Sequence, residues 1–452
     1  MMYNRLRRMK QERVLAIHDI SCVGKCSLTV ALPIISAAGE ECSVLPTAVL
    51  STHTGGFTGF TFRDLTEDIS PIGAHWKSLG LRIDAIYTGF LGSFEQIDLV
   101  KGLIDDLSDQ RPAVYVDPVM ADKGKMYAIF GPDFPAGMRS LCEKADLIMP
   151  NLTELAFMLG FEYEEGPYSR EYIDGIFSKA EVLGVSRIVI TGVSFEPGKL
   201  GAVWKDYQTG ETGSSMRKEV PGYYHGTGDI FGSALVGALE AGVSLGESVD
   251  IAVDFTVGSI IRTYSSNTDV RFGVNFECGL IDYARSIKEK APYRVAINYG
   301  DFGSIEKMAS AVWHEAYAGI VSEDQIDYML AKFQSAEAIK NQISEGLTYE
   351  IARRDGKDAG YIGYKFDGDE LFVSKIYVME PLRKEGVGKA LLLRAFEAGR
   401  CGGSKRMRLT VNKNNSKAIA FYEAMGLEKM SELRTDIGEG FVMDDFVMGR
   451  GI

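Results

Sequence analysis

The chain has 452 residues, 46% of them hydrophobic and 25% charged, and a formal net charge of −13 at pH 7. This length exceeds a typical domain of about 100–250 residues, so we expect at least two domains. The negative charge argues against a general nucleic-acid or anionic-membrane binder, and no apolar run approaches the roughly 18 residues of a membrane span. Six scattered cysteines indicate neither a zinc site nor a disulfide framework and favour a cytoplasmic protein.

Residues 1–12 open with a basic run that is not followed by a secretory apolar region, so they are expected to be a disordered extension. From Arg13 onward, short apolar runs of strand length alternate with helical segments. This alternation predicts an α/β fold with a helix-covered, mostly parallel sheet. The expected strands are 13–18, 43–49, 85–88, 113–117, 147–149 and 187–191, and the expected helices include 27–36, 96–107, 170–183 and 230–239.

Polar residues gather where these strands end. Ligands of parallel sheets bind at the carboxyl ends of the strands, so these positions are the first candidates for a site. Asp117 and Glu154 follow two of the expected strands and could hold Mg²⁺ through oxygen atoms and water. Either acid taken alone is more often a helix cap or a turn residue.

A glycine-rich turn, Gly226-Thr227-Gly228-Asp229, leads into the apolar helix 230–239. The free N–H groups at a helix start carry the positive end of the helix dipole, so this turn could bind a phosphate. Asp229 has two interpretations. It could cap the helix, or it could act as a base that takes a proton from a hydroxyl group as that oxygen attacks phosphorus.

The order of four motifs favours the second interpretation. Pro46-Thr47 with Ser51–Gly55, Asp117–Met120, Pro150–Glu154 and Gly226–Asp229 follow one another along the chain. Together they resemble the ribokinase-like superfamily, and within it the pyridoxal kinases, over residues 13–285. One departure is Ala121, where this family often has glycine, which puts the local loop geometry in doubt.

The resemblance implies ATP-dependent phosphorylation of the 5′-hydroxymethyl group of pyridoxal, pyridoxamine or pyridoxine, with Asp229 as the base. It also implies a homodimer, since related kinases are commonly dimers. A hydroxymethylpyrimidine kinase is the alternative, although the segment from Thr47 to Gly55 favours pyridoxal. The implied ligand residues are Ser21, Thr47, His53 and Tyr127 for the vitamer, Gly226, Thr227 and Gly228 for the transferring phosphate, Asp117, Asn151, Glu154 and Thr191 for ATP, and Asp117 and Glu154 for Mg²⁺.

A second domain is expected after a linker at 286–292, where a charged run meets Pro292. The pattern then restarts with a strand at 293–298, helices at 304–317 and 323–333, and strand runs that end at 371–378. About 160 residues suffice for an independent core. We therefore expect a separate domain over 293–452.

This domain contains its own glycine turn, Arg383-Lys-Glu-Gly386-Val-Gly388, at the start of a helix. A tight turn is the simple explanation, and a pyrophosphate site is the alternative. With the strand 406–411 and the helix 415–427, the turn resembles the GNAT superfamily of N-acetyltransferases over most of 293–450, which implies an α+β fold.

The GNAT resemblance implies acetyl-CoA as a substrate and an amine of unknown identity as the acceptor. Tyr422 would be the general acid, unless it is a plain core tyrosine, and no base can be named beyond a guess at Glu370 or Asp369. A module that senses CoA without transferring the acetyl group is the alternative. The implied acetyl-CoA residues are Val378, Arg383, Gly386, Val387, Gly388, Lys389 and Asn415.

Overall fold

The computed structural model describes residues 11–317, 319–354 and 356–452. The described chain forms two compact units, Gln11–Lys290 and Ala291–Ile452, which are treated separately below. Most of the extension expected at residues 1–12 lies outside the described residues. Within the segment expected as a linker, residues 286–290 form the end of helix α9 (Leu280–Lys290).

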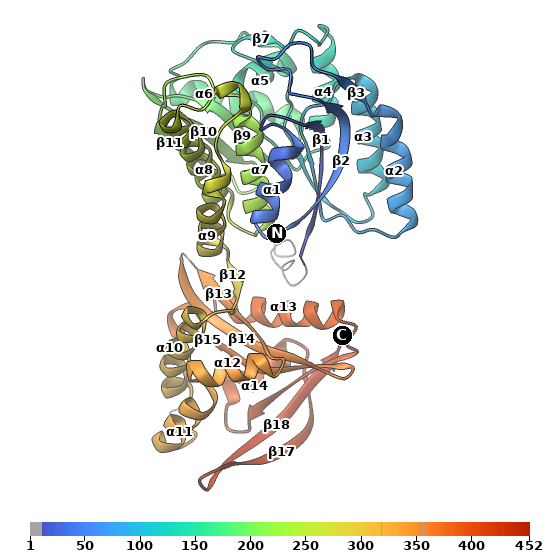
Figure 1. Cartoon of the computed structure of the whole chain (residues 1–452). Helices are drawn as coiled ribbons and strands as arrows, with labels where there is room; N and C mark the ends of the chain where they lie inside the picture. Colours follow the sequence, from blue (N-terminus) through green and yellow to red (C-terminus); the bar gives the residue numbers. More distant parts are fainter. Residues whose placement is uncertain (1–10, 318, 355) are drawn as a thin grey trace. The chain divides into compact units, whose positions relative to one another are not determined.

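The first unit is built on one large sheet, confirming the α/β class (Figure 1). Its inner strands pair in parallel, whereas the pairs at both edges are antiparallel. In spatial order the strands are β11 (Thr212–Lys218), β10 (Lys199–Asp206), β9 (Arg187–Val193), β8 (Leu147–Ile148), β5 (Ala113–Val116), β4 (Ala85–Thr88), β1 (Arg13–Ser21), β2 (Glu41–Leu50) and β3 (Phe62–Asp64). A small hairpin, β6 (Ala121–Asp122) and β7 (Lys125–Met126), follows β5.

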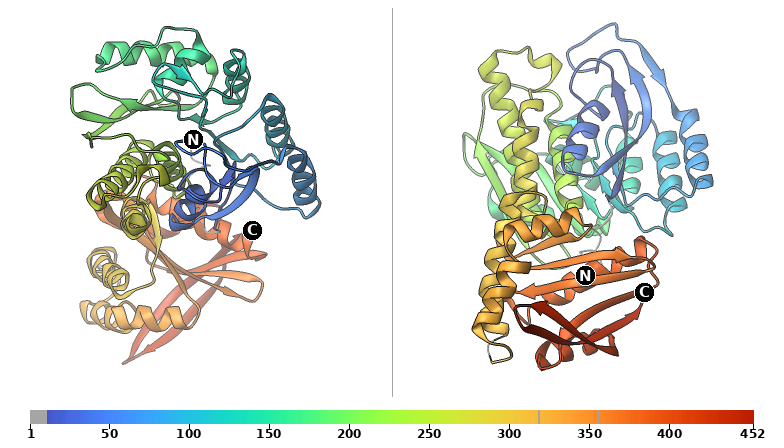
Figure 2. Two further views of the ribbon diagram at one scale, coloured as in Figure 1. Left: turned by 45° about the horizontal axis from the view of Figure 1, so that its top comes forward. Right: turned by 60° about the horizontal axis from the view of Figure 1, so that its bottom comes forward.

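Helices cover both faces of this sheet (Figures 1 and 2). One face carries α1 (Leu28–Ala37), α7 (Thr227–Glu240), α8 (Leu245–Ser266) and α9. The other carries α2 (Thr66–Ser78), α3 (Phe94–Asp106), α4 (Phe134–Cys142), α5 (Leu152–Leu159) and α6 (Arg170–Ala180).

The inner strands are buried on both faces, which explains their short, almost continuous apolar sequences. In β4, for example, Ala85, Ile86, Tyr87 and Thr88 are all buried. Because β1, β2, β4 and β5 run parallel, their carboxyl ends meet at one edge of the sheet. The start of α7 lies at the same edge, since Gly226 packs against Lys25 after β1. The polar strand ends that the sequence singled out lie at this edge.

The second unit is a mostly antiparallel sheet with one parallel pair, as expected for an α+β domain. Its strands, in spatial order, are β12 (Tyr293–Val295), β13 (Thr348–Arg354), β14 (Lys357–Asp367), β15 (Glu370–Val378), β16 (Arg406–Asn412), β18 (Phe441–Gly451) and β17 (Glu428–Gly438). The parallel pair is β15 and β16. Their ladder ends at the pair Val373–Leu409, while both strands run on, so the sheet opens between their carboxyl ends.

Two groups of helices pack on opposite faces of this second sheet. One apolar cluster forms under α10 (Tyr299–Ala316), α11 (Glu323–Phe333) and α12 (Ala336–Ser344). The other forms under α13 (Val387–Cys401) and α14 (Ser416–Ala424). The helix expected at 304–317 begins earlier, because Asn298 caps Asp301 and starts α10 at Tyr299.

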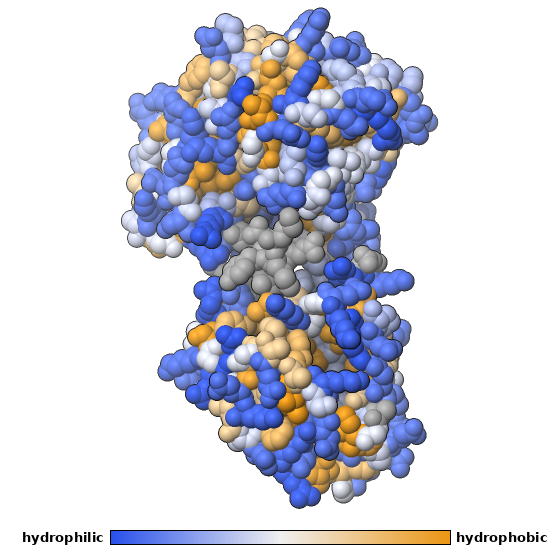
Figure 3. Space-filling view, turned by 180° about the vertical axis from the view of Figure 1, so that it is seen from behind, coloured by the Kyte–Doolittle hydropathy of each residue, from blue (hydrophilic) through white to orange (hydrophobic). Residues whose placement is uncertain are grey.

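Figure 3 shows that the visible face of each unit is mostly hydrophilic, with separate apolar patches. Among the residues that the structure describes, no helix combines the length and the apolar character needed to cross a membrane.

Candidate functional site

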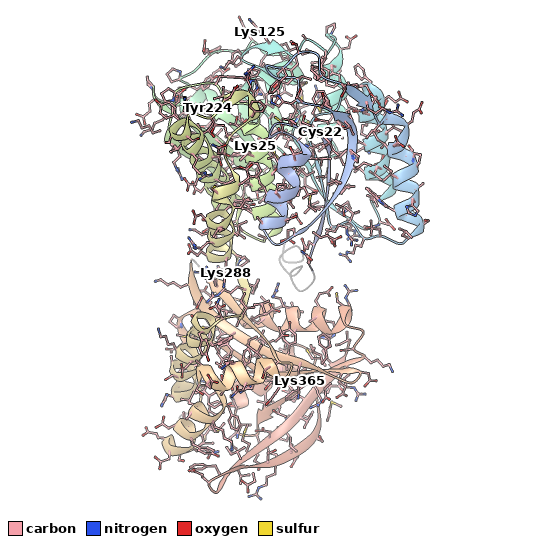
Figure 4. The ribbon with its side chains drawn as sticks, viewed as in Figure 1. Cys22, Lys25, Lys125, Tyr224, Lys288 and Lys365 are labelled. Carbon is pink, nitrogen blue, oxygen red and sulfur yellow. The ribbon has the colours of Figure 1, made fainter. Side chains whose placement is uncertain are left out.

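The glycine turn opens α7 as expected. Gly226 is the N-cap residue and adopts a left-handed conformation with φ of 74°, which favours glycine. The first-turn N–H groups of Thr227, Gly228 and Asp229 have no acceptor within the helix, so they can face an anion. Figure 4 marks Tyr224 in the loop that leads into this turn, and Cys22 and Lys25 in the loop between β1 and α1.

Asp229 lies in the first turn of α7, beside the start of α1. Burial raises the pKa of Asp229 to about 7, and the neighbouring Asp19 raises it further, whereas the backbone N–H of Ser27 lowers it. A carboxylate with a pKa near 7 exchanges protons readily at neutral pH, which suits a general base. Asp229 is not the N-cap residue, because Gly226 occupies that position and Asp229 is the third residue of the helix.

Asp19 was missed by the sequence reasoning. Its buried carboxylate accepts a hydrogen bond of 2.6 Å from the Ser27 hydroxyl, and Ser21 donates to it over 3.4 Å. Burial raises the pKa of Asp19, while His53 and the hydroxyl donors lower it. The predicted substrate residue Ser21 is thus next to a second acid, and the Asp19-x-Ser21 pattern was the available signal.

Several buried polar side chains at the ends of β1, β2 and β4 lack partners. Among the described residues, the Thr47 and Thr88 hydroxyls and both ring nitrogens of His18 have no hydrogen-bond partner. His18 is opposite Pro46 in the β1–β2 ladder, and its neighbour Ile17 is opposite Thr88. Buried polar groups are normally satisfied, so this cluster indicates a place where a polar ligand supplies the partners.

His53 is fixed by hydrogen bonds at both ring nitrogens. The backbone N–H of Gly55 donates to Nδ1 over 3.0 Å, so Nε2 carries the proton and donates to the carbonyl oxygen of Arg271 over 2.5 Å. Tyr127 lies in a different part of the site. Burial, and then Glu154 and Asp122, raise the pKa of Tyr127.

Asp117 and Glu154 are two buried acids, and the charge of Asp117 affects Glu154. Burial raises the pKa of both groups; Asp229 raises that of Asp117 further, and Asp117 raises that of Glu154. Both Glu154 oxygens accept backbone N–H groups, Oε1 from Met120 over 3.2 Å and Oε2 from Asn151 over 2.9 Å. Among the described residues, no hydrogen-bond donor reaches the Asp117 carboxylate, and no cluster of three or more His, Cys, Asp or Glu side chains could hold a metal unaided.

Asn151 and Thr191 are adjacent across neighbouring strands. The Asn151 side chain makes two hydrogen bonds: Oδ1 accepts from the N–H of Glu154 over 3.0 Å, and Nδ2 donates to the carbonyl oxygen of Ala121 over 2.8 Å, which leaves one N–H and one lone pair for a ligand. Ala121 itself is in the β6 strand and needs no glycine-like freedom. The left-handed positions of this loop are Lys123 and Gly124 instead.

In the second unit, the turn 383–388 also opens a helix. Gly386 is the N-cap of α13 with φ of 86°, and Val387 and Gly388 form the first turn. Added to Gly388, a β-carbon would come 3.5 Å from Cγ2 of Val378, so the helix start and the end of β15 are in close contact. This places free helix N–H groups beside the open edge of β15.

The other residues predicted to bind acetyl-CoA differ in whether their side chains already bond to other parts of the protein. Arg383 donates to the carbonyl oxygen of Val378 over 3.1 Å and pairs with Glu315, so its side chain is not free for a phosphate. Lys389 is exposed, and Asn415 caps α14 through the N–H of Ala418 over 3.2 Å.

Tyr422 is buried on α14. Burial, together with Tyr317, raises the pKa of Tyr422, so the phenol carries its proton at neutral pH. Tyr317 in turn shares a hydrogen bond of 3.2 Å with Tyr377 on β15. The phenol is therefore a proton donor within a group of tyrosines.

The guessed bases lie at the wrong end of the sheet. Glu370 is the first residue of β15 and Val378 the last, so they are about 26 Å apart along the strand. Glu370 also pairs with Arg408 over 2.7 Å, and Asp369 with Lys405 over 3.3 Å.

Comparison with known families gives two matches. The phosphomethylpyrimidine kinase family model matches residues 37–272, and the acetyltransferase (GNAT) family model matches residues 312–427. Residues in the second unit also align with the spermidine N(1)-acetyltransferase of Thermoplasma acidophilum, with 28% identity over 149 residues that cover 32% of this chain and 90% of the relative.

The first unit resembles several solved or curated kinases. A Bacteroides thetaiotaomicron protein, provisionally described as a phosphomethylpyrimidine kinase and crystallised with pyridoxal, is 36% identical, with a TM-score of 0.59 over 62% of this chain and 99% of its own. The pyridoxal kinase of Lactobacillus plantarum is 31% identical, with a TM-score of 0.56 over 61% and 98% of the two chains. The pyridoxine kinase of Bacillus subtilis is 28% identical over 42% of this chain and 68% of its own.

Proposed function

The chain belongs to the phosphomethylpyrimidine kinase family and carries a C-terminal GNAT acetyltransferase domain, and from this premise we propose that its first unit phosphorylates the 5′-hydroxymethyl group of B6 vitamers. The observation that carries the proposal is Asp229, a carboxylate with a pKa of about 7 in the first turn of α7. The relatives described as pyridoxal and pyridoxine kinases support a vitamer as the acceptor.

In the proposed reaction, Asp229 takes the proton of the hydroxymethyl group as that oxygen attacks the γ-phosphorus of ATP. The N–H groups of Thr227 and Gly228 stabilise the charge on the transferring phosphoryl group, because they are held in place by the helix. Thr47 and the Asp19–Ser21 pair hold the ring of the acceptor. Thr47 suits this role, since its buried hydroxyl has no partner among the described residues.

Asp117 and Glu154 fit a divalent cation that arrives with the nucleotide. Burial raises the pKa of both groups, Asp229 raises that of Asp117 further and Asp117 raises that of Glu154, and a cation would relieve these costs. Two protein carboxylates with phosphate oxygens and water are a usual coordination set for Mg²⁺. The ion would supply charge neutralisation at the phosphates, while Asp117 and Glu154 would hold it.

A hydroxymethylpyrimidine remains the alternative acceptor, because the family model that matches residues 37–272 is named for a related pyrimidine, phosphomethylpyrimidine. Turnover on pyridoxal, pyridoxamine and hydroxymethylpyrimidine, measured side by side with ATP, separates the two. We expect the vitamers to give the higher kcat/KM. A clear preference for the pyrimidine would overturn the choice of vitamer and leave the kinase assignment intact.

We also propose that the second unit, taken as residues 293–452, transfers an acetyl group from acetyl-CoA to an amine. The opening between β15 and β16, next to the first turn of α13, supports a site for the pantetheine and pyrophosphate of CoA. Tyr422 would return a proton to the departing thiolate. A relative described as a spermidine acetyltransferase supports an amine acceptor.

A CoA-binding module without transferase activity is the competing function for this unit. Acetyl-CoA binding and acetyl transfer across a panel of amines distinguish the two. Binding accompanied by transfer is the expected result, whereas binding without transfer to any amine would favour the module.

A further inference from the structure

The second unit contains a buried acid, Asp445, that has no role in the proposed acetyl-CoA site. Asp445, in β18, is only 4% exposed, and among the described residues its Oδ1 atom has no hydrogen-bond partner. Leaving a buried carboxylate oxygen unpaired costs folding free energy, on the order of 1–3 kcal/mol or more for a charged group. Buried polar groups normally have partners, and a cationic ligand could be the partner of this oxygen.

The position of Asp445 in the sheet points to the same opening. In the ladder between β16 and β18, Asp445 is opposite Asn412. Asn412 is three residues beyond Leu409, where the ladder between β15 and β16 ends. Asp445 therefore lies at the carboxyl end of β16, the end at which β15 reaches Val378 and α13 begins.

The side of the sheet that Asp445 faces can be read from its neighbours. Side chains alternate along a strand, so Asp445 shares a face with Met443, which packs in the cluster under α10, α11 and α12. Tyr317 and Tyr377 belong to the same cluster, and Asp445 raises the pKa of Tyr317. The acid therefore has aromatic rings near it, which also favour a cation.

Three other acids of this unit are paired with arginines. Glu315 pairs with Arg383, Glu350 with Arg394 over 2.7 Å, and Glu370 with Arg408 over 2.7 Å. Lys413 lowers the pKa of Asp445 but only partly offsets the effect of burial, and it also forms ion pairs with Glu432 and Asp444, each within 2.7 Å. Burial and Asp444 raise the pKa of Asp445 to about 6.

We propose that Asp445 binds the ammonium group of the acetyl acceptor, a primary alkylamine, and takes the proton that makes it nucleophilic. This inference rests on the proposed acetyltransferase function. A slender aliphatic amine, such as a polyamine, suits an acid among aromatic rings.

The R–NH₃⁺ group gives one proton to Asp445, and the freed lone pair attacks the thioester carbonyl carbon. A C–N bond forms and the C–S bond breaks. The thiolate takes the phenol proton of Tyr422, and the second amine proton returns to Tyr422. The products are the N-alkylacetamide and free CoA, and the proton on Asp445 leaves to water.

The test compares Asp445→Asn with Asp444→Asn in the full chain. Asn matches the shape of Asp without its charge, and Asp444 is the adjacent residue, which is ion-paired with Lys413 and exposed. Acetyl transfer from acetyl-CoA to spermidine and putrescine, acetyl-CoA affinity and thermal stability are measured for each. We expect Asp445→Asn to lower kcat/KM by about 100-fold or more, with acetyl-CoA affinity kept and Tm unchanged or raised.

Three outcomes would overturn the proposal. Transfer by Asp445→Asn within about threefold of the unmodified chain would remove Asp445 from the reaction while leaving the transferase function in place. A parallel loss of Tm and of acetyl-CoA binding would give Asp445 a purely structural role. Acetyl-CoA binding by the unmodified chain, with no transfer to either amine, would overturn the transferase function together with this inference.

Discussion

A β-carbon added to Gly226 would lie 2.1 Å from the carbonyl oxygen of Lys25. The turn before α7 therefore packs directly against the loop between β1 and α1, and the same two loops bring Asp229 to the backbone N–H of Ser27. The base is positioned by contacts between segments about 200 residues apart in the sequence.

Gly226→Ala should lower stability by about 2 kcal/mol or more, because the backbone oxygen of Lys25 cannot move away as a flexible side chain would. Gly228→Ala is the matched control, since nothing lies within 4 Å of its added carbon and its φ is not left-handed. Denaturant unfolding of both variants measures the difference. Equal midpoints would show that the close approach does not constrain the turn.

The pH dependence of the kinase follows from Asp229. The base must be ionised to accept a proton, and its pKa is raised to about 7, so kcat/KM for pyridoxal should fall as pH drops below about 7. The acid limb should be visible between pH 8 and about 5.5. A profile that stays flat down to about pH 5 would exclude a base with a raised pKa.

The raised pKa of Asp229 also predicts that the protein is less stable at high pH, where the kinase is more active. A raised folded pKa means that the fold favours protonated Asp229, so this contribution is present at low pH and is lost as pH rises through about 7. Asp229→Asn should therefore be more stable than the unmodified chain at pH 8, by roughly 1 kcal/mol or more, and about equal to it near pH 4. Thermal unfolding at the two pH values tests this.

Thr47→Val tests whether the unpaired Thr47 hydroxyl binds the pyridine ring of the acceptor. Valine has the shape of threonine without the buried Oγ1 atom, which lacks a partner among the described residues, so Tm should stay the same or rise. KM for pyridoxal should rise about tenfold, because the hydroxyl would no longer meet the ligand. An unchanged KM would place the ligand elsewhere.

Substitutions of Asp117 and Glu154, the two proposed Mg²⁺ ligands, should differ in their effects on metal dependence and on stability. Removal of divalent cations by a chelator should abolish turnover, and Asp117→Asn should raise the Mg²⁺ concentration needed for half-maximal rate about tenfold. Glu154→Gln should also lower stability, because both Glu154 oxygens accept backbone N–H groups, from Met120 and Asn151, and the amide nitrogen of Gln cannot accept either one. A kinase that turns over fully in excess chelator would contradict the assigned metal role.

The sequence predicted features that depend on neighbours along the chain. The strand ends, the glycine turn and the start of α7 are local patterns, so Asp229, Asp117 and Glu154 could be named in advance. Asp19 also follows a strand-like run, beside the predicted substrate residue Ser21, but its role could not be assigned, because only the fold brings Ser27 and Asp229 next to it. The departure at Ala121 put the geometry of this loop in doubt, and the structure places the left-handed conformations at Lys123 and Gly124.

Non-local pairing explains what was missed in the second unit. The strands β17 and β18 carry charged residues at many positions, and β17 is exposed along most of its length, so no apolar alternation marked it as a strand. Asp445 acquires its significance only from its register opposite Asn412. The guess at Glu370 failed because the sequence does not show which end of β15 adjoins α13.

The central claim, that the first unit is a kinase with Asp229 as its base, is tested most directly by Asp229→Asn. Turnover of pyridoxal with ATP and Mg²⁺ is measured for this variant and for the unmodified chain, with the fold checked by circular dichroism. We predict a folded variant whose kcat is lower by about 10²–10⁴-fold. A folded variant that keeps near-full kinase turnover would contradict the account.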